Sequence, residues 1–227
     1  MNQVQFDRSW PLTRLWAHRG LTWHVELDGQ LNINGVKGFL LPGDVETLLK
    51  LGKHIPPGGV VVEVGSWMGL STILIVNGLL LNMNFDARVH AVDTWRGSKE
   101  HQDFAIVKDD QLFSTFEANI AGAGVASWIT PHRVDSVSAA SAFEDGSIDA
   151  IFIDGDHSEA GCLADLRAYY PKLKASGIFF GHDAAPNSGV TRALDRFTAE
   201  TGRRFQISPP PEGHYIWTML AEEAQGG

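Results

Sequence analysis

Two apolar stretches of the sequence end in side chains that could bind a metal ion. Asp154 follows residues 148–153, and both His182 and Asp183 follow residues 178–181. Neighbouring parallel strands would bring these three side chains to one edge of a sheet. A set of two carboxylates and one imidazole, with no thiolate, suits Mg²⁺ or Mn²⁺ and could admit Fe²⁺, Co²⁺ or Zn²⁺. The alternative is a set of loop acids with a capping histidine.

The first of these stretches is followed by more than one ionisable group. Asp156 and His157 come directly after Asp154 and Gly155, so two carboxylates and an imidazole lie within four residues. Burying this much charge without a partner would be costly. A cation or a polar ligand is therefore expected beside this turn.

A third apolar run, Val60–Val64, contains one acid, Glu63, and leads into a glycine turn. It predicts a buried parallel strand whose carboxyl end opens into a ligand-binding crevice, with Gly65 making the sharp turn and the next helix beginning near Gly69. A dinucleotide fold has a further glycine in the middle of this turn. Bulky Trp67 stands there instead, which disfavours an NAD-dependent oxidoreductase. A strand-to-helix turn without a ligand is the plain alternative.

The run 87–93 repeats the pattern of an apolar strand that ends in an acid. Asp93 lies 28 residues after Gly65, where an α/β nucleotide site places the carboxylate that accepts hydrogen bonds from ribose hydroxyls. The roles of two later residues are left open by the sequence pattern. Trp95 could wall an adenine pocket or pack in the core, and Asp135 could be the N-cap of an alanine-rich helix.

Composition limits the classes of function. The chain has 18 Lys and Arg against 27 Asp and Glu, and the formal net charge of −9 argues against nucleic acid as the partner. The single cysteine, Cys162, cannot form an internal disulfide, and the polar start lacks a signal-peptide core, so a cytoplasmic location is expected. The apolar helix predicted over residues 71–81 is too short to span a bilayer. These observations favour a small molecule as the ligand, with neither nucleic acid nor a membrane as partner.

The elements that must position these residues form one α/β unit. At 227 residues, the chain suits a single domain over residues 41–227, preceded by an N-terminal extension over residues 1–40. Besides a terminal hairpin within 204–219, the predicted strands are 60–64, 87–93, 127–132, 148–154 and 178–183, and the predicted helices are 45–51, 71–81, 112–120, 159–174 and 190–197.

The N-terminal extension lacks this alternation of strands and helices. Its runs 22–27 and 31–34 flank an Asp28-Gly29 turn signal and predict a small hairpin. The aromatic residues of the extension could pack on the domain, cap the active site or make a homo-oligomer contact. They are Phe6, Trp10, Trp16 and Trp23.

From about Gly38 to Ala221, the chain resembles a small class I S-adenosylmethionine (SAM)-dependent methyltransferase. Four motifs carry the resemblance in order: V-V-E-V-G-S-x-x-G-x-S-T, V-D-T-W, F-I-D-G-D-H-S and G-H-D. The subgroup that it resembles contains metal-dependent sugar and polyketide-sugar O-methyltransferases. The family fold is a Rossmann-like, doubly wound α/β sheet of seven strands with the last strand antiparallel, which the terminal hairpin fits.

The resemblance implies roles for individual residues. A divalent cation would lie at Asp154, His182 and Asp183, and the histidine replaces an acid found in many relatives, so the metal preference stays open. The implied cofactor residues are Glu63, Gly65, Ser66, Gly69, Ser71 and Thr72 around the methionine part of SAM, Asp93 at the ribose with Trp95 close by, and Asp135 with Ser136 beside the adenine.

Asp156 or His157 matches the position of the general base in this family. An ion beside Asp154 would lower the pKa of nearby acids, whereas an imidazole already titrates near neutral pH, which favours His157 slightly. The expected reaction is O-methylation of a small hydroxylated metabolite, assisted by this base and by Mg²⁺ or Mn²⁺. Two further classes stay open, an NAD-dependent oxidoreductase and a SAM-binding protein without transfer activity.

Overall fold

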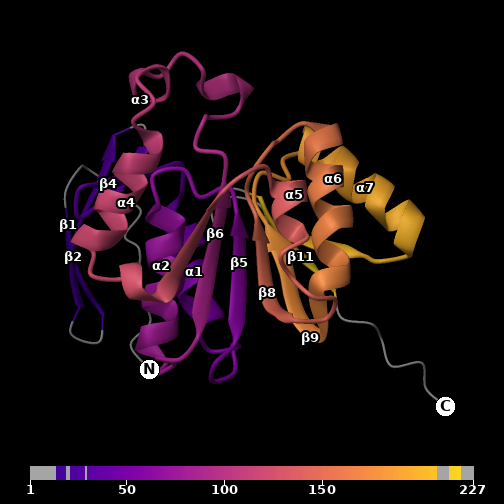
Figure 1. The fold of residues 1–227 in the computed structure, drawn as a ribbon, viewed down its shortest axis with the longest axis horizontal. Helices are drawn as coiled ribbons and strands as arrows, with labels where there is room; N and C mark the ends of the chain where they lie inside the picture. Colours follow the sequence, from indigo (N-terminus) through magenta and orange to yellow (C-terminus); the bar gives the residue numbers. More distant parts are fainter. Residues whose placement is uncertain (1–13, 19–20, 29, 209–214, 221–227) are drawn as a thin grey trace.

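The computed structural model describes residues 14–18, 21–28, 30–208 and 215–220. A seven-stranded sheet in the order β10-β11-β9-β8-β5-β6-β7 lies between two groups of helices (Figure 1). Strand β11 pairs antiparallel with both of its neighbours, and the remaining pairs are parallel. The predicted Rossmann-like sheet with its last strand antiparallel is confirmed, together with an N-terminal extension.

The bounds of the elements follow the alternation of strands and helices. The strands of the main sheet are β5 Val60–Val64, β6 Arg88–Asp93, β7 Ile129–Arg133, β8 Ile148–Ile153, β9 Leu173–Gly181, β10 Phe205–Ser208 and β11 Ile216–Met219. The helices are α1 Pro42–Leu51, α2 Leu70–Leu81, α3 Ala105–Lys108, α4 Leu112–Gly122, α5 Ser136–Ala140, α6 Glu159–Tyr169 and α7 Gly189–Thr201, with the short 3-10 helices η1 Lys99–His101, η2 Ala126–Trp128 and η3 Tyr170–Lys172.

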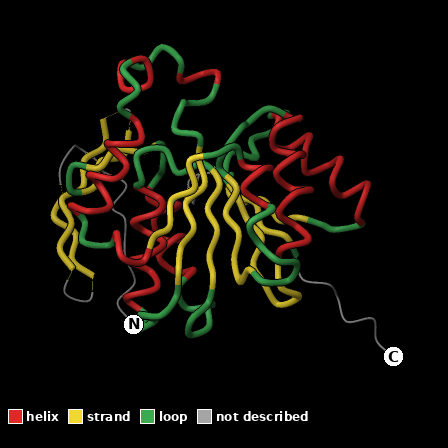
Figure 2. The backbone as a smooth tube through the Cα atoms, in the orientation of Figure 1, coloured by secondary structure: helices red, strands yellow, loops and turns green. Residues whose placement is uncertain are grey.

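The two faces of the sheet have separate hydrophobic cores because successive side chains of a strand point to opposite faces. On β5, Val61 belongs to the core that packs against α1, α2 and α4, which we call the α2-side core. Its neighbours Val62 and Val64 belong to the core that packs against α5, α6 and α7, the α6-side core. Figure 2 shows the strands running between these helices. This explains the nearly continuous apolar run in the sequence.

Two predicted boundaries are wrong. The strand predicted over 127–132 begins at Ile129, because η2 occupies the residues before it. The helix predicted over 159–174 ends at Tyr169, and η3 leads directly into β9 at Leu173. Pro171 lies in η3, where it lacks the N–H that would continue the α-helical pattern. The fifth predicted strand therefore begins earlier than residue 178.

The N-terminal extension forms its own antiparallel sheet, in the order β1-β2-β3-β4. The predicted hairpin is present as the antiparallel pair of β2 and β3. Leu31 and Ile33 belong to the α2-side core, so the extension packs on the domain. The division at residue 40 stays a prediction, and the side chains of Phe6, Trp10, Trp16 and Trp23 lie outside the described part of the structure. The four strands are β1 Arg14–His18, β2 Leu21–Asp28, β3 Gln30–Ile33 and β4 Val36–Gly38.

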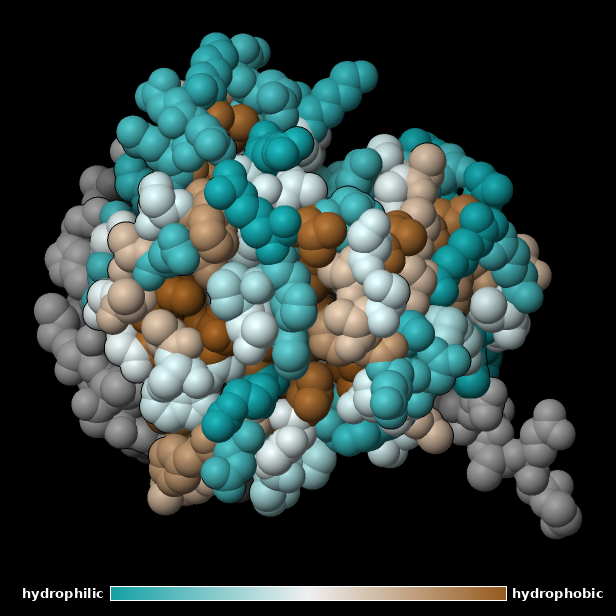
Figure 3. Space-filling model, viewed as in Figure 1, coloured by the Kyte–Doolittle hydropathy of each residue, from teal (hydrophilic) through white to brown (hydrophobic). Residues whose placement is uncertain are grey.

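Between β6 and α4, residues 94–111 leave the sheet and project beyond its carboxyl edge, at the top of Figure 1. We call this segment, which contains η1 and α3, the excursion. In Figure 3 its surface is largely hydrophilic, and a notch separates it from the lobe that α5, α6 and α7 form. Among the described residues, the helices lack the length and apolar character that are needed to cross a membrane.

Candidate active site

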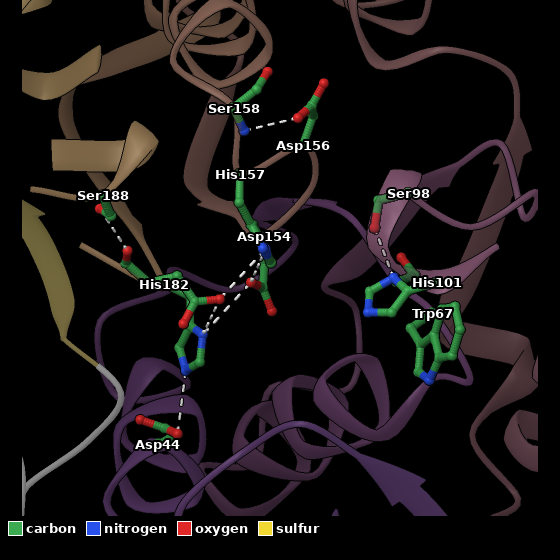
Figure 4. A network of polar contacts seen from close by, with 12 residues as sticks. Asp44, Trp67, Ser98, His101, Asp154, Asp156, His157, Ser158, His182 and Ser188 are labelled. Carbon is green, nitrogen blue, oxygen red and sulfur yellow. Dashed lines mark hydrogen bonds and ion pairs between the residues drawn. The ribbon is translucent and has the colours of Figure 1, made fainter. Parts of the chain in front are cut away.

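The carboxyl ends of β8 and β9 bring Asp154, His182 and Asp183 together as predicted (Figure 4). The two strands are parallel neighbours, and the N–H of His182 donates to the carbonyl of Ile153 at 3.1 Å. Nδ1 of His182 lies 3.5 Å from Oδ1 of Asp154 and 3.3 Å from Oδ2 of Asp183. Asp183 has a φ of +61°, a conformation that is uncommon for a residue other than glycine. We call these three residues the acid–histidine centre.

The donor atoms of this centre fit a divalent cation. One donor atom from each residue lies within 4.8 Å of the others. Ligands at about 2.1 Å from an ion in adjacent octahedral positions are about 3.0 Å apart. The distances of 3.3 and 3.5 Å from Nδ1 to the two carboxylates are close to that separation. Small side-chain movements would therefore give three cis ligands, although the centre's role as a metal site stays a prediction.

A fourth residue, Asp44, contacts the far side of the imidazole. Its Oδ2 lies 3.2 Å from Nε2 of His182, and the same oxygen accepts a hydrogen bond from the N–H of Leu41 at 2.5 Å. Asp44 is 1% exposed and lies in the first turn of α1. A carboxylate on the second nitrogen of a ligating histidine fixes the orientation of the ring. Burial lowers the pKa of His182, but Asp154, Asp183 and Asp44 together raise it well above its ordinary value.

The two candidate bases point in different directions. Nε2 of His157 lies 3.3 Å from Oδ2 of Asp183 and 3.6 Å from Oδ1 of Asp154, so the ring faces the acid–histidine centre. The carboxylate of Asp156 turns back toward α6, where it accepts a hydrogen bond from the N–H of Ser158 at 2.8 Å (Figure 4). It also covers Gly161, where an added Cβ would lie 2.4 Å from it. The geometry favours His157, whose role as base stays a prediction.

Glu63 is fully buried, at 0% exposure, as is Thr72. Its Oε2 accepts hydrogen bonds from the hydroxyls of Ser66, at 2.8 Å, and of Thr72. The hydroxyl of Ser71 also lowers the pKa of this carboxyl, but burial has the larger effect and raises it from 4.5 to about 7. Glu63 therefore orients the hydroxyls of the turn and of the first residues of α2 and presents no surface to a ligand.

The elevated pKa of Glu63 predicts a pH-dependent stability. The folded state holds this proton more tightly than the unfolded state, so the stabilisation is complete below pH 4.5 and is lost as the pH rises through about 7. A shift of this size corresponds to about 3 kcal/mol. Denaturant unfolding of the ligand-free protein at several pH values should show this decline, and Glu63→Gln should lack it. The same decline in Glu63→Gln would assign the effect to other groups.

Asp93 braces the glycine turn as well as ending β6. Its Oδ2 accepts hydrogen bonds from the N–H groups of Ser66, at 3.0 Å, and Trp67, at 2.9 Å. Its Oδ1 accepts from the N–H of Trp95 at 2.7 Å. Both tryptophans have positive φ, +46° for Trp67 and +50° for Trp95, and these hydrogen bonds offset the strain. Oδ1 retains acceptor capacity for a ribose hydroxyl, the role that was predicted for this acid.

Gly65 allows the glycine turn to contact the acid–histidine centre. Its φ is +90°, and an added Cβ would lie 2.0 Å from the carbonyl oxygen of Asp154. Gly69, with a φ of +91°, is the N-cap of α2. The predicted methionine-binding turn and the predicted metal site are therefore in backbone contact.

The remaining predicted cofactor residues lie at the same edge of the sheet with different surroundings. Trp95 is 1% exposed and packs against both Phe113 and Phe116, which favours the packing role over an adenine wall. Asp135 is the N-cap of α5 and accepts a hydrogen bond from the N–H of Ser138 at 2.9 Å, so the N-cap prediction is confirmed. The hydroxyl of Ser136 donates to Asp165. Contacts of these residues with adenine stay predictions.

The sequence matches the model of a known protein family. A family model described as a methyltransferase domain matches residues 62–184. A search of curated proteins finds no match.

Solved structures show the same fold at low sequence identity. The O-methyltransferase NovP is 16% identical with a TM-score of 0.59, over 77% of this chain and 78% of its own. Precorrin-6y C5,15-methyltransferase from Geobacter metallireducens is 15% identical with a TM-score of 0.58, over 78% and 87%. Cofactor-bound Rv0187 from MTB is 14% identical with a TM-score of 0.57, over 80% and 81%. Proteins named for different acceptors thus share this fold.

Proposed function

The chain belongs to the methyltransferase domain family and is a SAM-dependent enzyme of class I, and on this basis we propose that it methylates a hydroxyl oxygen of a small metabolite. The observation that carries the choice of oxygen is the acid–histidine centre in contact with the glycine turn. A hydroxyl is a poor nucleophile at neutral pH, so its methylation requires proton removal or polarisation. The centre offers the groups for both, whereas the unprotonated form of an amine is nucleophilic without polarisation by a metal ion.

The residues of the chain have separate roles in the proposed reaction. SAM supplies an electrophilic methyl group on a sulfonium sulfur. Asp93 fixes the glycine turn and accepts from the ribose, and Glu63 orients the hydroxyls that face the methionine part. His157 takes the hydroxyl proton as the oxygen–methyl bond forms and the sulfur–methyl bond breaks, leaving S-adenosylhomocysteine (SAH) and protonated His157.

The acid–histidine centre would hold the acceptor hydroxyl beside His157. A divalent cation at Asp154, His182 and Asp183 would orient and acidify a pair of adjacent hydroxyls. Asp44 keeps the ring of His182 turned toward the centre. The preference for Mg²⁺ or Mn²⁺ follows from the two carboxylates, and the imidazole leaves room for Fe²⁺, Co²⁺ or Zn²⁺.

Two other functions are less well supported. Family membership argues against the NAD-dependent oxidoreductase, as does Trp67 in the glycine turn. A SAM-binding protein without transfer activity would have no use for an imidazole aimed at two carboxylates next to the methionine turn.

Release of SAH in the presence of candidate acceptors tests the proposal. The protein is incubated with SAM and Mg²⁺ and with pairs of acceptors that differ only in a hydroxyl or an amino group. SAH formation with the hydroxylated member of a pair supports O-methylation. Formation with the amino members alone would contradict it.

Asp93→Ala should weaken SAH binding by about 1–3 kcal/mol, the range for losing a charge-assisted hydrogen bond. Calorimetry measures the affinity, and thermal unfolding measures the added effect of three unpaired N–H groups. Asp145→Ala is the matched control, because this exposed acid pairs with Lys172 on the surface. An unchanged SAH affinity in Asp93→Ala would contradict the ribose assignment.

A further inference from the structure

Four aromatic side chains from three separate segments meet at the carboxyl edge of the sheet. We call Phe39, Trp67, His101 and Phe104 the aromatic cluster. The ring of Phe39 lies 5.4 Å from His101 and 6.2 Å from Phe104, and that of His101 lies 5.5 Å from Phe104. The planes of these three rings are within 16–23° of parallel. Trp67 contacts the same group, with its ring centroid 4.6 Å from that of His101.

The aromatic cluster exposes apolar surface where the chain is otherwise polar. Phe39 is 41% exposed and Phe104 is 42% exposed. Around Phe104, the excursion presents exposed charged side chains such as Lys99, Asp103 and Lys108. Covering apolar rings that are open to water beside such a hydrophilic segment is favourable for the binding of a ligand.

The aromatic cluster lies next to the reacting groups. Trp67 belongs to the glycine turn, which contacts the backbone of Asp154 through Gly65. In Figure 4, Trp67 and His101 lie across from Asp154 and His157. An acceptor whose hydroxyl reaches His157 would therefore extend toward these rings.

The adenine of SAM is not the expected occupant. Its predicted neighbours, Asp135 and Ser136, begin α5, whose residues Ala139 and Ala140 belong to the α6-side core. Trp67 packs against the α2-side core on the opposite face of the sheet. The rings are therefore left for the acceptor.

We propose that the aromatic cluster is the acceptor subsite and that the acceptor carries a planar aromatic group, which stacks on Phe39 and Phe104 while an attached hydroxyl reaches His157. This inference rests on the proposed function and names its substrate class. Three nearly parallel rings present flat π surfaces, and aromatic groups gain more from such surfaces than saturated groups of equal size. Nδ1 of His101 is 2.6 Å from the hydroxyl of Ser98, which fixes the ring within the cluster.

Binding of two matched probes tests this subsite. Catechol and cis-1,2-cyclohexanediol both carry adjacent hydroxyls, and only catechol is flat and aromatic. Each probe is titrated into the protein saturated with SAH, by calorimetry or ligand-observed NMR, with chelator present because the more acidic hydroxyls of catechol would also bind a metal ion more strongly. We expect catechol to bind at least about tenfold more tightly, because ring stacking adds to area burial.

Substitutions separate the subsite from general packing. Phe39→Leu and Phe104→Leu keep an apolar side chain and should each weaken catechol binding about two- to tenfold, with SAH affinity unchanged. Phe85→Leu is the control, because Phe85 is 50% exposed and precedes β6 at the opposite edge of the sheet. Equal binding of the two probes, no binding of catechol, or unchanged catechol affinity in both variants would overturn the subsite. If the unmodified protein does not bind SAH, the proposed function is overturned instead.

Discussion

Removal of divalent cations should lower methyl transfer by about 10²- to 10³-fold, because polarisation of the acceptor hydroxyl is worth several kcal/mol. Chelator-treated protein is assayed for SAH release, and Mg²⁺ or Mn²⁺ is then added back. Activity should return with the added ion. The expectation rests on His182, whose Nδ1 lies within 3.5 Å of two carboxylates.

Variants of the acid–histidine centre distinguish a metal site from a structural cluster. Asp183→Ala should lose activity to the same extent as chelation and should not recover when Mg²⁺ or Mn²⁺ is added. Asp44→Asn should weaken Mn²⁺ binding about 10- to 100-fold, the usual effect of removing the partner of a ligating histidine. Asp145→Asn, on the exposed surface, is the control. Full activity of both the chelated protein and Asp183→Ala would leave these acids with a structural role.

His157→Ala should lower turnover by roughly 10²-fold or more while leaving SAM affinity nearly unchanged, the size expected for losing a general base. The ring of His157 faces the centre, at 3.3 Å from Asp183. Asp156→Asn should retain most of the activity, because this side chain is engaged by Ser158 and covers Gly161. Turnover at substrate saturation and SAM affinity are measured separately for each variant.

The same two variants can also contradict the assignment of His157 as the base. If Asp156→Asn is inactive and His157→Ala turns over normally, the carboxylate is the base and the side chains rearrange when substrates bind. The unfolding temperatures of the variants are compared so that a loss of folding is not mistaken for a loss of catalysis. This control matters because the turn that carries His157 packs on α7, where Gly189 contacts the carbonyl of His157.

The order of strands and the convergence of acids followed from local sequence patterns. Strands β6, β8 and β9 end in, or lead directly into, polar residues, and the parallel pairing of β8 with β9 then placed Asp154 beside His182. Side-chain alternation on β5 supplied a second check, since apolar residues on both faces require a covered strand. Such features depend on neighbours along the chain or on the pairing rule, and both can be read from a sequence.

Other features depend on contacts between distant segments and left no local signal. Asp44 appears in the sequence only as a residue near a helix start, and its contact with His182 joins positions far apart in the chain. The bracing of Trp67 and Trp95 by Asp93 likewise requires the ends of two strands to be in place.

The aromatic cluster shows the same limit. Phe39 follows β4 and Phe104 precedes α3, and nothing in either neighbourhood indicates a shared surface. The orientation of Asp156 was also beyond prediction, because it depends on the space above Gly161 at the start of α6. The periodicity of apolar residues shows which face of a helix or strand is buried. It carries no information about which residues from distant loops contact one another.

Transfer of a labelled methyl group from SAM, followed by NMR identification of the methylated atom, tests the central claim most directly. The acceptors are aromatic compounds with adjacent hydroxyls and their amino counterparts, with Mg²⁺ present. The account predicts that the label is found in a methoxy group and that its transfer stops in chelator. Label found on nitrogen or carbon, or no transfer to any hydroxylated acceptor while SAM is bound, would contradict it.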